Sequence, residues 1–182
     1  MASPLTRAKH AVKTLDAAVD RRVDQVRGHA VADRVMYAAS ELGDWSLIWH
    51  LIGVGQALLP GRDPMTAVRL SAILGAESVL VNGGVKSLFR RTRPVWDDDE
   101  PRPHRLRTPK STSFPSGHAS SAFTAATVLA QGDPLWPLYY GVAVVVASSR
   151  VYVKIHHASD VLAGAVLGIG LGTVARRVWP KP

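Results

Sequence analysis

Hydrophobic residues of this chain are gathered in long runs that polar segments separate from one another. The runs cover residues 44–59, 65–88, 116–131, 135–148 and 159–178. A membrane-spanning helix needs about 20 apolar residues, and several of these runs are shorter than roughly 18. The pattern predicts an all-α integral membrane bundle of five to six transmembrane helices, with a soluble all-α bundle of buried helices as the alternative.

The N-terminal region has a different pattern. Residues 1–28 place apolar side chains at helical three-to-four spacing, with Lys, Arg and Asp on the other faces, which predicts an amphipathic helix. Such a helix can lie on a membrane surface, and a solvated helix or frayed tail is the alternative. A second helix is expected at residues 29–42, where charges make a poor membrane span. We therefore expect an interfacial helical extension at 1–42 and a transmembrane domain at 43–182.

Two features within the apolar runs predict how the helices pack. Glu77 lies inside the second run, and an ionisable group at membrane depth is expected to face the interior of the bundle. Gly164, Gly168 and Gly172 repeat every four residues in the last run. This small-xxx-small face predicts close packing against a neighbouring helix.

The amino-acid composition limits the kinds of molecule that the protein is expected to bind. The net charge of +8 favours nucleic acid, anionic lipid or a phosphorylated substrate. Trp and Tyr residues suit interfacial belts better than base stacking, so no nucleic-acid partner is expected. The absence of cysteine excludes a disulfide framework, a thiolate nucleophile and a Cys-ligated metal. Acidic residues 97–100 resemble a metal site only in composition, because consecutive acids point in different directions, and a solvated loop is expected there.

The segment 149–160 combines a guanidinium, two imidazoles and a carboxylate. If the chain is helical from His156 onward, His156 and Asp160 lie one turn apart on one face. Asp160 could then accept a hydrogen bond from Nδ1–H and leave Nε2 unprotonated, as a nucleophile or base requires. The planar fork of Arg150 suits phosphate oxygens. A charged helix entry with a local His–Asp contact is the alternative.

Two further segments carry candidate chemistry. Lys86 and Arg93 are seven residues apart, about two helical turns, so both are expected on one side of a helix end. A proline followed by Ser116 and Gly117 at a helix start frees backbone N–H groups and predicts an anion site. His118 would then lie in the first turn, able to donate a proton. Counting helices places the ends that carry all three segments at one membrane face.

Together these segments resemble the PAP2 (type 2 phosphatidic acid phosphatase) superfamily. The first matching motif is Lys86 followed after six residues by Arg93-Pro94, and the second is Pro-Ser-Gly-His at 115–118. The third matching motif is Ser-Arg at 149–150, followed after five residues by His156 and after three more by Asp160. The three motifs follow the family's order, and the flanking apolar helices fit its membrane branch, whereas the N-terminal 40 or so residues are not covered.

The resemblance implies a role for each matched residue. His156 would attack phosphorus and form a phosphohistidine, Asp160 would orient its ring, and His118 would protonate the leaving oxygen and then activate water. The phosphoryl oxygens would be held by Lys86, Arg93, Arg150, Ser116 and the amide of Gly117. Neither a metal nor a cofactor is expected. His157 is expected to be a rim or structural residue, and Arg90 and Arg91 to be lipid-headgroup or loop charges.

The expected function is hydrolysis of a phosphomonoester or pyrophosphate on a lipid or polyprenyl carrier. A lipid phosphotransferase would use the same phosphohistidine with an acceptor other than water, and product analysis separates the two. A vanadium haloperoxidase-like enzyme resembles the same site, but those enzymes are larger soluble proteins. A non-enzymatic basic membrane protein with decayed motifs ranks last, because no motif position is missing.

Charge near the helix ends predicts the orientation of the chain. Basic residues favour the cytoplasmic side, and Arg62, Arg69, Arg176, Arg177 and Lys181 belong to the end opposite the candidate site. The active site is therefore expected on the extracytoplasmic face of the cell membrane. With five spans the basic N-terminus would also lie outside, so either residues 29–42 cross as a sixth helix or the N-terminal helix lies on the surface.

Overall fold

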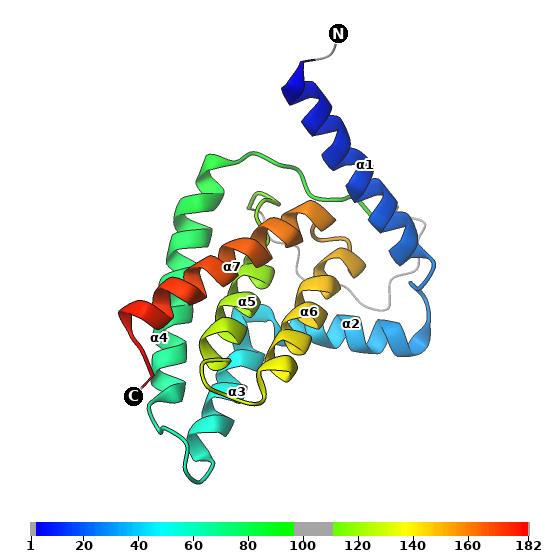
Figure 1. The fold of residues 1–182 in the computed structure, drawn as a ribbon. Helices are drawn as coiled ribbons and strands as arrows, with labels where there is room; N and C mark the ends of the chain where they lie inside the picture. Colours follow the sequence, from blue (N-terminus) through cyan, green and yellow to red (C-terminus); the bar gives the residue numbers. More distant parts are fainter. Residues whose placement is uncertain (1–2, 97–110, 182) are drawn as a thin grey trace.

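The computed structural model describes residues 3–96 and 111–181. Its helices are α1 (Pro4–Asp24), α2 (Ala30–Leu42), η1 (Asp44–Ser46), α3 (Leu47–Leu58), α4 (Thr66–Ser78), η2 (Val79–Gly84), η3 (Val85–Leu88), α5 (Gly117–Leu129), α6 (Trp136–Tyr152) and α7 (Ala158–Val178). They form a bundle with α5 between its neighbours (Figure 1). Within the described ranges there is no strand, which confirms the all-α prediction.

The five apolar runs all form helices, but their lengths differ. Two helical segments, Thr66–Leu88 and Ala158–Val178, are long and apolar enough to cross a membrane by length and composition. The shorter helices are α3, α5 and α6, with 12, 13 and 17 residues. At about 1.5 Å per residue, 13 residues rise about 20 Å, less than the roughly 30 Å of a bilayer core. Five or six crossings therefore stay a prediction.

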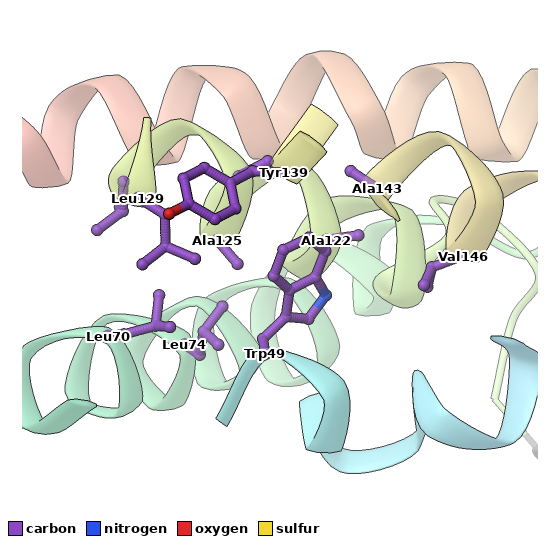
Figure 2. Close-up of a cluster of buried hydrophobic side chains, with 11 residues drawn as sticks. Trp49, Leu70, Leu74, Ala122, Ala125, Leu129, Tyr139, Ala143 and Val146 are labelled. Carbon is purple, nitrogen blue, oxygen red and sulfur yellow. The ribbon is translucent and has the colours of Figure 1, made fainter. Parts of the chain in front are cut away.

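Helix α5 forms the centre of the bundle because its residues are small. Alanine, serine and threonine dominate it, and from Ala119 to Leu129 every residue except Phe123 is buried. Small side chains let neighbouring helices approach closely. Figure 2 shows the main cluster of buried hydrophobic side chains, in which Trp49 of α3 and Tyr139 of α6 lie near the alanines of α5.

The glycine face of α7 packs directly on α5. A Cβ atom at Gly164, Gly168 or Gly172 would lie closer than 3.0 Å to a backbone carbonyl oxygen of α5 or of its N-cap residue. The hydroxyl of Thr124 also donates to the carbonyl of Gly168 over 3.1 Å. The small-xxx-small prediction is confirmed, and this packing sets the N-terminal ends of α5 and α7 side by side. Glu77 of α4 is buried, which confirms that it faces the interior.

The two N-terminal helices contact the bundle from outside. Residue Asp16 is the one buried position described on α1, and the helix projects past the rest of the molecule in Figure 1. Helix α2 packs on α6, and Tyr152 donates a hydrogen bond to Asp33 over 2.6 Å. The chain then turns sharply at η1, where Trp45 and Ser46 both have positive φ angles. The division of the chain after residue 42 stays a prediction.

Candidate active site

The three candidate segments meet at one end of the bundle. Arg93 donates from Nη1 to the carbonyl of Ile155 over 2.8 Å, which joins the first segment to the third. The backbone N–H of Ser116 donates to the carbonyl of Asp160 over 3.0 Å, which joins the second to the third. The convergence that was expected from counting helices is therefore present in the fold.

His156 lies just outside α7 rather than within it. The helix begins at Ala158 with His157 as its N-cap, so the condition of a helix running from His156 onward is not met. A backbone hydrogen bond to the carbonyl of Arg150, 3.0 Å long, holds His156 in the preceding turn. Its Nδ1 lies 3.7 Å from Oδ2 of Asp160, too far for a hydrogen bond but close enough for the carboxylate to stabilise a positive charge on the ring.

The other ring nitrogen of His156 faces Arg93. Nε2 lies 3.2 Å from Nη1 of Arg93. A guanidinium only donates, so Nε2 accepts and the proton of the neutral ring belongs on Nδ1, toward Asp160. His156 is 3% exposed. Burial lowers the pKa of His156 to about 3, with Arg93 and Arg150 adding to the effect and Asp160 opposing it.

Asp160 is held by donors on all sides. It has no exposed surface, and its Oδ2 accepts hydrogen bonds from the backbone N–H of His157, over 2.9 Å, and from the hydroxyl of Ser113. Its Oδ1 accepts from Nη1 of Arg91 over 2.6 Å. Asp160 is also the third residue of α7, where an acid favours the helix start. The carboxylate is therefore fixed in place.

Arg91 has a different position from the one expected. Its Nη2 lies 2.5 Å from Oδ2 of Asp16 on α1, so its guanidinium bridges Asp16 and Asp160. The interpretation of Arg91 as a lipid-headgroup or loop charge is wrong. Sequence spacing could not reveal this bridge, because its acids are distant along the chain. His157, the N-cap of α7, has the structural position expected of it.

Lys86 and Arg93 come together without sharing a helix. The helix ends at Leu88 and Arg93 follows in an extended segment, so the prediction that both lie on one helix end is wrong. Both nevertheless line an open cleft of about 760 Å³. A Cβ atom at Gly117 would lie 3.4 Å from Nζ of Lys86, which places this ammonium group beside the start of α5.

Arg150 is the most deeply buried cation of the site. It is 2% exposed, and its Nη1 donates a hydrogen bond to the hydroxyl of Ser40 on α2. Its Nε has no hydrogen-bond partner among residues 3–96 and 111–181. A buried donor without a partner is costly unless a ligand can satisfy it. One donor of the guanidinium is therefore left over for a hydrogen bond from outside the described residues.

The start of α5 carries the remaining candidate residues. Ser116 is the N-cap, and its hydroxyl accepts from the N–H of Ala119 over 3.4 Å, while Gly117 is the first helical residue. His118 lies in the first turn, and its Nε2 is 2.8 Å from Oδ1 of Asp44 in η1. Asp44 is a second acid paired with a histidine of the site. It precedes an apolar run, and nothing in its spacing to His118 signals the pair.

Candidate metal ligands do not gather in the described part of the chain. No group of three or more His, Asp or Glu side chains is positioned there to hold a metal ion. Acidic residues 97–100, expected in a solvated loop, lie outside the described residues. Metal independence is a property of the reaction and stays a prediction.

Comparison with known protein families identifies the kind of protein that carries this site. The model of the PAP2 superfamily matches residues 66–182, which include all three motifs and more than half of the chain. The chain belongs to the PAP2 superfamily. Within this PAP2 protein the match excludes α1, α2, η1 and α3, and with them Asp16, Ser40 and Asp44.

Individual relatives agree with the family. The PAP2 protein is 31% identical over 140 residues to decaprenylphosphoryl-5-phosphoribose phosphatase from Mycobacterium tuberculosis, covering 76% of each chain. Its fold matches the crystal structure of a transmembrane PAP2 type phosphatidylglycerolphosphate phosphatase from Bacillus subtilis, with a TM-score of 0.68, 27% identity, and 92% and 86% of the two chains covered. It also matches LpxE from Aquifex aeolicus, with a TM-score of 0.66, 27% identity, and 88% and 94% covered.

These relatives establish the class of the PAP2 protein. It has the fold of a transmembrane PAP2 phosphatase, and it is a phosphoric ester or diphosphate hydrolase of the membrane. The predictions of family, helical membrane fold and enzyme class are confirmed.

Proposed function

We propose that this PAP2 protein removes phosphate from a phosphomonoester or diphosphate on a lipid or polyprenyl carrier, through a phosphohistidine at His156. The observation that carries the proposal is the state of its Nε2. This nitrogen accepts a hydrogen bond from Arg93, so its lone pair is unprotonated and lies beside a cation suited to a phosphoryl oxygen. A nucleophile needs that lone pair, and the substrate phosphate needs that cation.

In the first step Nε2 of His156 attacks phosphorus. The N–P bond forms as the bond between phosphorus and the leaving oxygen breaks, and the ring becomes positively charged. Asp160 stabilises this charge across 3.7 Å, a separation that is expected to shorten in the complex, since catalytic hydrogen bonds often tighten when substrate binds. The fixed donors around Asp160 keep it ionised and in place.

His118 supplies the proton for the leaving oxygen. Burial disfavours the imidazolium form of His118, and Asp44, which accepts a hydrogen bond from its Nε2, opposes that effect and leaves Nδ1 for the substrate. After the leaving alcohol or phosphate departs, neutral His118 takes a proton from water. The water oxygen attacks phosphorus, the N–P bond breaks, and inorganic phosphate and unprotonated Nε2 are regenerated.

Three cations and a helix N-terminus hold the phosphoryl group. Lys86, Arg93 and Arg150 balance its negative charge, and the hydroxyl of Ser116 and the amide of Gly117 add donors at the positive end of α5. The free Nε of Arg150 and the position of Lys86 beside Gly117 support this arrangement. Charge stabilisation by side chains makes a metal ion unnecessary for this mechanism.

The substrate carries its phosphate on a membrane-bound carrier. The name of the Mycobacterium tuberculosis relative specifies a decaprenyl-linked sugar phosphate, and that of the Bacillus subtilis structure a glycerophospholipid phosphate. Both substrates present a phosphate at the membrane surface. We propose the same class of substrate for this chain, acted on at the extracytoplasmic face, because the basic residues of the opposite end favour the cytoplasm.

Phosphate release from a panel of lipid and polyprenyl phosphates in detergent, with EDTA present, tests the function. We expect release by the wild type, its loss in His156→Ala, and normal release in His29→Ala, where an exposed histidine without a capping hydrogen bond is removed. Acid-labile phosphate on the wild-type protein would identify the phosphohistidine. Activity retained by a folded His156→Ala variant, or lost with EDTA, would refute the mechanism. Product formed only when an acceptor alcohol is added would indicate a phosphotransferase.

The absence of cysteine allows a direct test of orientation. Ser87→Cys would place one thiol in the cleft at the catalytic end, and Arg177→Cys would place one near the other end of α7. In intact cells a membrane-impermeant maleimide should label the first variant and spare the second. The reverse labelling pattern would place the site in the cytoplasm.

A further inference from the structure

We infer that Asp16, on the N-terminal helix and outside the segment matched by the family, is a positioning residue for the His156–Asp160 pair. The inference rests on the proposed function, in which His156 is the nucleophile. Asp16 lies too far along the chain from the motifs for any spacing to indicate it. The fold nevertheless places its carboxylate two hydrogen bonds from Asp160, through Arg91, and Asp160 lies 3.7 Å from the imidazole of His156.

The burial of Asp16 is unusual for its helix. Helix α1 exposes most of its apolar side chains, and the residue it buries is a carboxylate, 8% exposed. Removing a charge from water is costly unless partners compensate for it. The partners are Nη2 of Arg91 at 2.5 Å, the N–H of Ser159 at 2.9 Å and the hydroxyl of Ser159 at 3.0 Å. All of them surround the catalytic pair.

The first connection runs through Arg91. One nitrogen of its guanidinium binds Asp16 and the other binds Asp160. An Arg91–Asp160 pair by itself would be neutral, and Asp160 would then do little to stabilise a positive imidazole. The second carboxylate gives the three groups a net negative charge. Asp16 therefore preserves the negative potential that the phosphohistidine ring needs.

The second connection runs through the first turn of α7. The amide of Ser159 is one of the N–H groups that a helix start leaves without an intrahelical partner, and Asp16 accepts its hydrogen bond. Ser159 precedes Asp160 in that turn. Asp16 therefore acts as a cap supplied from another helix, and it fixes the turn that carries Asp160. Loss of the carboxylate would disturb both the charge and the position of Asp160.

An acidic residue that only attaches α1 to the bundle should leave catalysis unchanged when it is substituted. Helix α1 has such a residue. Asp24 pairs with Arg27, in the turn that follows α1, and lies 3.6 Å from Nζ of Lys154. Neither of these ion pairs of Asp24 includes Asp160 or His156. Asp24→Asn therefore removes one carboxylate from α1 without touching the catalytic pair, and serves as the matched control for Asp16→Asn.

The experiment uses the full chain in detergent and measures phosphate release, formation of acid-labile phosphoenzyme and thermal unfolding. Variants are Asp16→Asn, Asp16→Glu, Asp24→Asn and His156→Ala. We expect Asp16→Asn to lower kcat on the order of 10²-fold, as misplacement of a catalytic group does, with KM little changed and phosphoenzyme formation slowed. Asp16→Glu, which keeps the charge, should recover part of kcat, and Asp24→Asn should match the wild type.

A double substitution tests the route through Arg91. If Asp16 acts through that guanidinium, Asp16→Asn should cost much less in an Arg91→Gln background than in the wild type. Wild-type kcat in Asp16→Asn would overturn the inference. So would a loss of kcat that follows thermal destabilisation and is not relieved in Asp16→Glu. Failure of the proposed function is a separate result, since it would appear as activity retained in His156→Ala.

Discussion

Nη1 of Arg93 lies 3.2 Å from Nε2 of His156, so a fixed cation is hydrogen-bonded to the atom proposed to attack phosphorus. The guanidinium is anchored at the same time by the carbonyl of Ile155, at 2.8 Å. A phosphoryl oxygen that binds Arg93 would therefore arrive next to the lone pair of His156. One side chain would position the substrate and keep the nucleophile unprotonated.

The geometry predicts that Arg93→Lys will be severely impaired although the charge is kept. Nε and Nη2 of Arg93 donate to the carbonyls of Ser111 and Thr112, both over 3.2 Å, and a lysine cannot reproduce this planar fork. We expect kcat for phosphate release to fall about 10²- to 10³-fold, as removal of one oxyanion donor does.

The neighbouring Arg90 is the control for this substitution, because its side chain is exposed. Arg90 lines the same cleft, so Arg90→Lys makes the same change of side chain beside the site and keeps the charge, and kcat should stay within about twofold. Equal rates for wild type and Arg93→Lys would show that the fork geometry is unimportant.

The protonation of His156 gives a second prediction. Burial lowers the pKa of His156 to about 3, whereas an unfolded histidine has a pKa of about 6.5. Between these values the unfolded chain binds more protons, so the folded state gains stability as pH rises and loses it as pH falls below about 6.5. From pH 7 to pH 5 this one group should lower the free energy of unfolding by about 2 kcal/mol.

Nitrogen-15 NMR of histidine-labelled protein measures the same property directly. The Nε2 signal of His156, assigned by its absence in His156→Gln, should stay that of a neutral ring at pH 5. The unfolding free energy of the wild type, minus that of His156→Gln, should become smaller as the pH falls from 7 to 5. An imidazolium signal at pH 6 would contradict the burial argument.

The Asp44–His118 pair predicts an effect that depends on the leaving group. Burial disfavours the imidazolium form of His118, and Asp44→Asn removes the carboxylate that opposes this effect, so less of the proposed proton donor would be present. General acid catalysis contributes about 10²- to 10⁴-fold when the leaving group is poor. We expect phosphate release from an alkyl or polyprenyl phosphate to slow on the order of 10²-fold, and release from p-nitrophenyl phosphate much less.

Asp63→Asn is the matched control, because Asp63 accepts a hydrogen bond from the N–H of Met65 in a turn between α3 and α4. Asp63→Asn should slow phosphate release from the alkyl or polyprenyl phosphate and from p-nitrophenyl phosphate by the same factor, or leave both rates unchanged. If Asp44→Asn also slowed both substrates by the same factor, a role in protonating the leaving group would be ruled out.

Local sequence was enough to predict the helices, the glycine face of α7 and the segments that form the site. Each of these depends on residues within a few turns of one another. His156 lies before α7 for an equally local reason, because His157 and Asp160 together cap the helix start. An acid three positions after a cap residue is a signal that could have placed this boundary.

Residues that support the site could not be predicted in the same way. Asp16 reaches Arg91 and Asp44 reaches His118 only because separate helices pack together, and the sequence separations are 75 and 74 residues. Spacing rules describe neighbours on one helix, and they carry no information about such pairs. The position of Arg93 beyond the helix that ends at Leu88 has the same origin, since Arg93 is held by loop carbonyls rather than by helical hydrogen bonds.

The contact between α5 and α7 gives the last prediction. Gly168→Ala would place a methyl group against the carbonyl of Ser120 in α5, at a distance that the backbone cannot accept without moving. Overpacking of this kind costs about 1 to 3 kcal/mol. The first turns of both helices carry residues proposed to be catalytic, so kcat should fall together with the temperature of unfolding.

Gly170→Ala is the control that separates the effect of crowding between the two helices from the effect of replacing glycine by alanine within a helix. Nothing lies within 4 Å of a Cβ atom at Gly170, two residues along the same helix. Alanine is favoured over glycine in a helix interior by roughly 0.5 to 1 kcal/mol, so this variant should equal or exceed the wild type in thermal unfolding. If Gly168→Ala were also as stable and active as the wild type, the close approach of α5 and α7 could not be what aligns the catalytic residues at their ends.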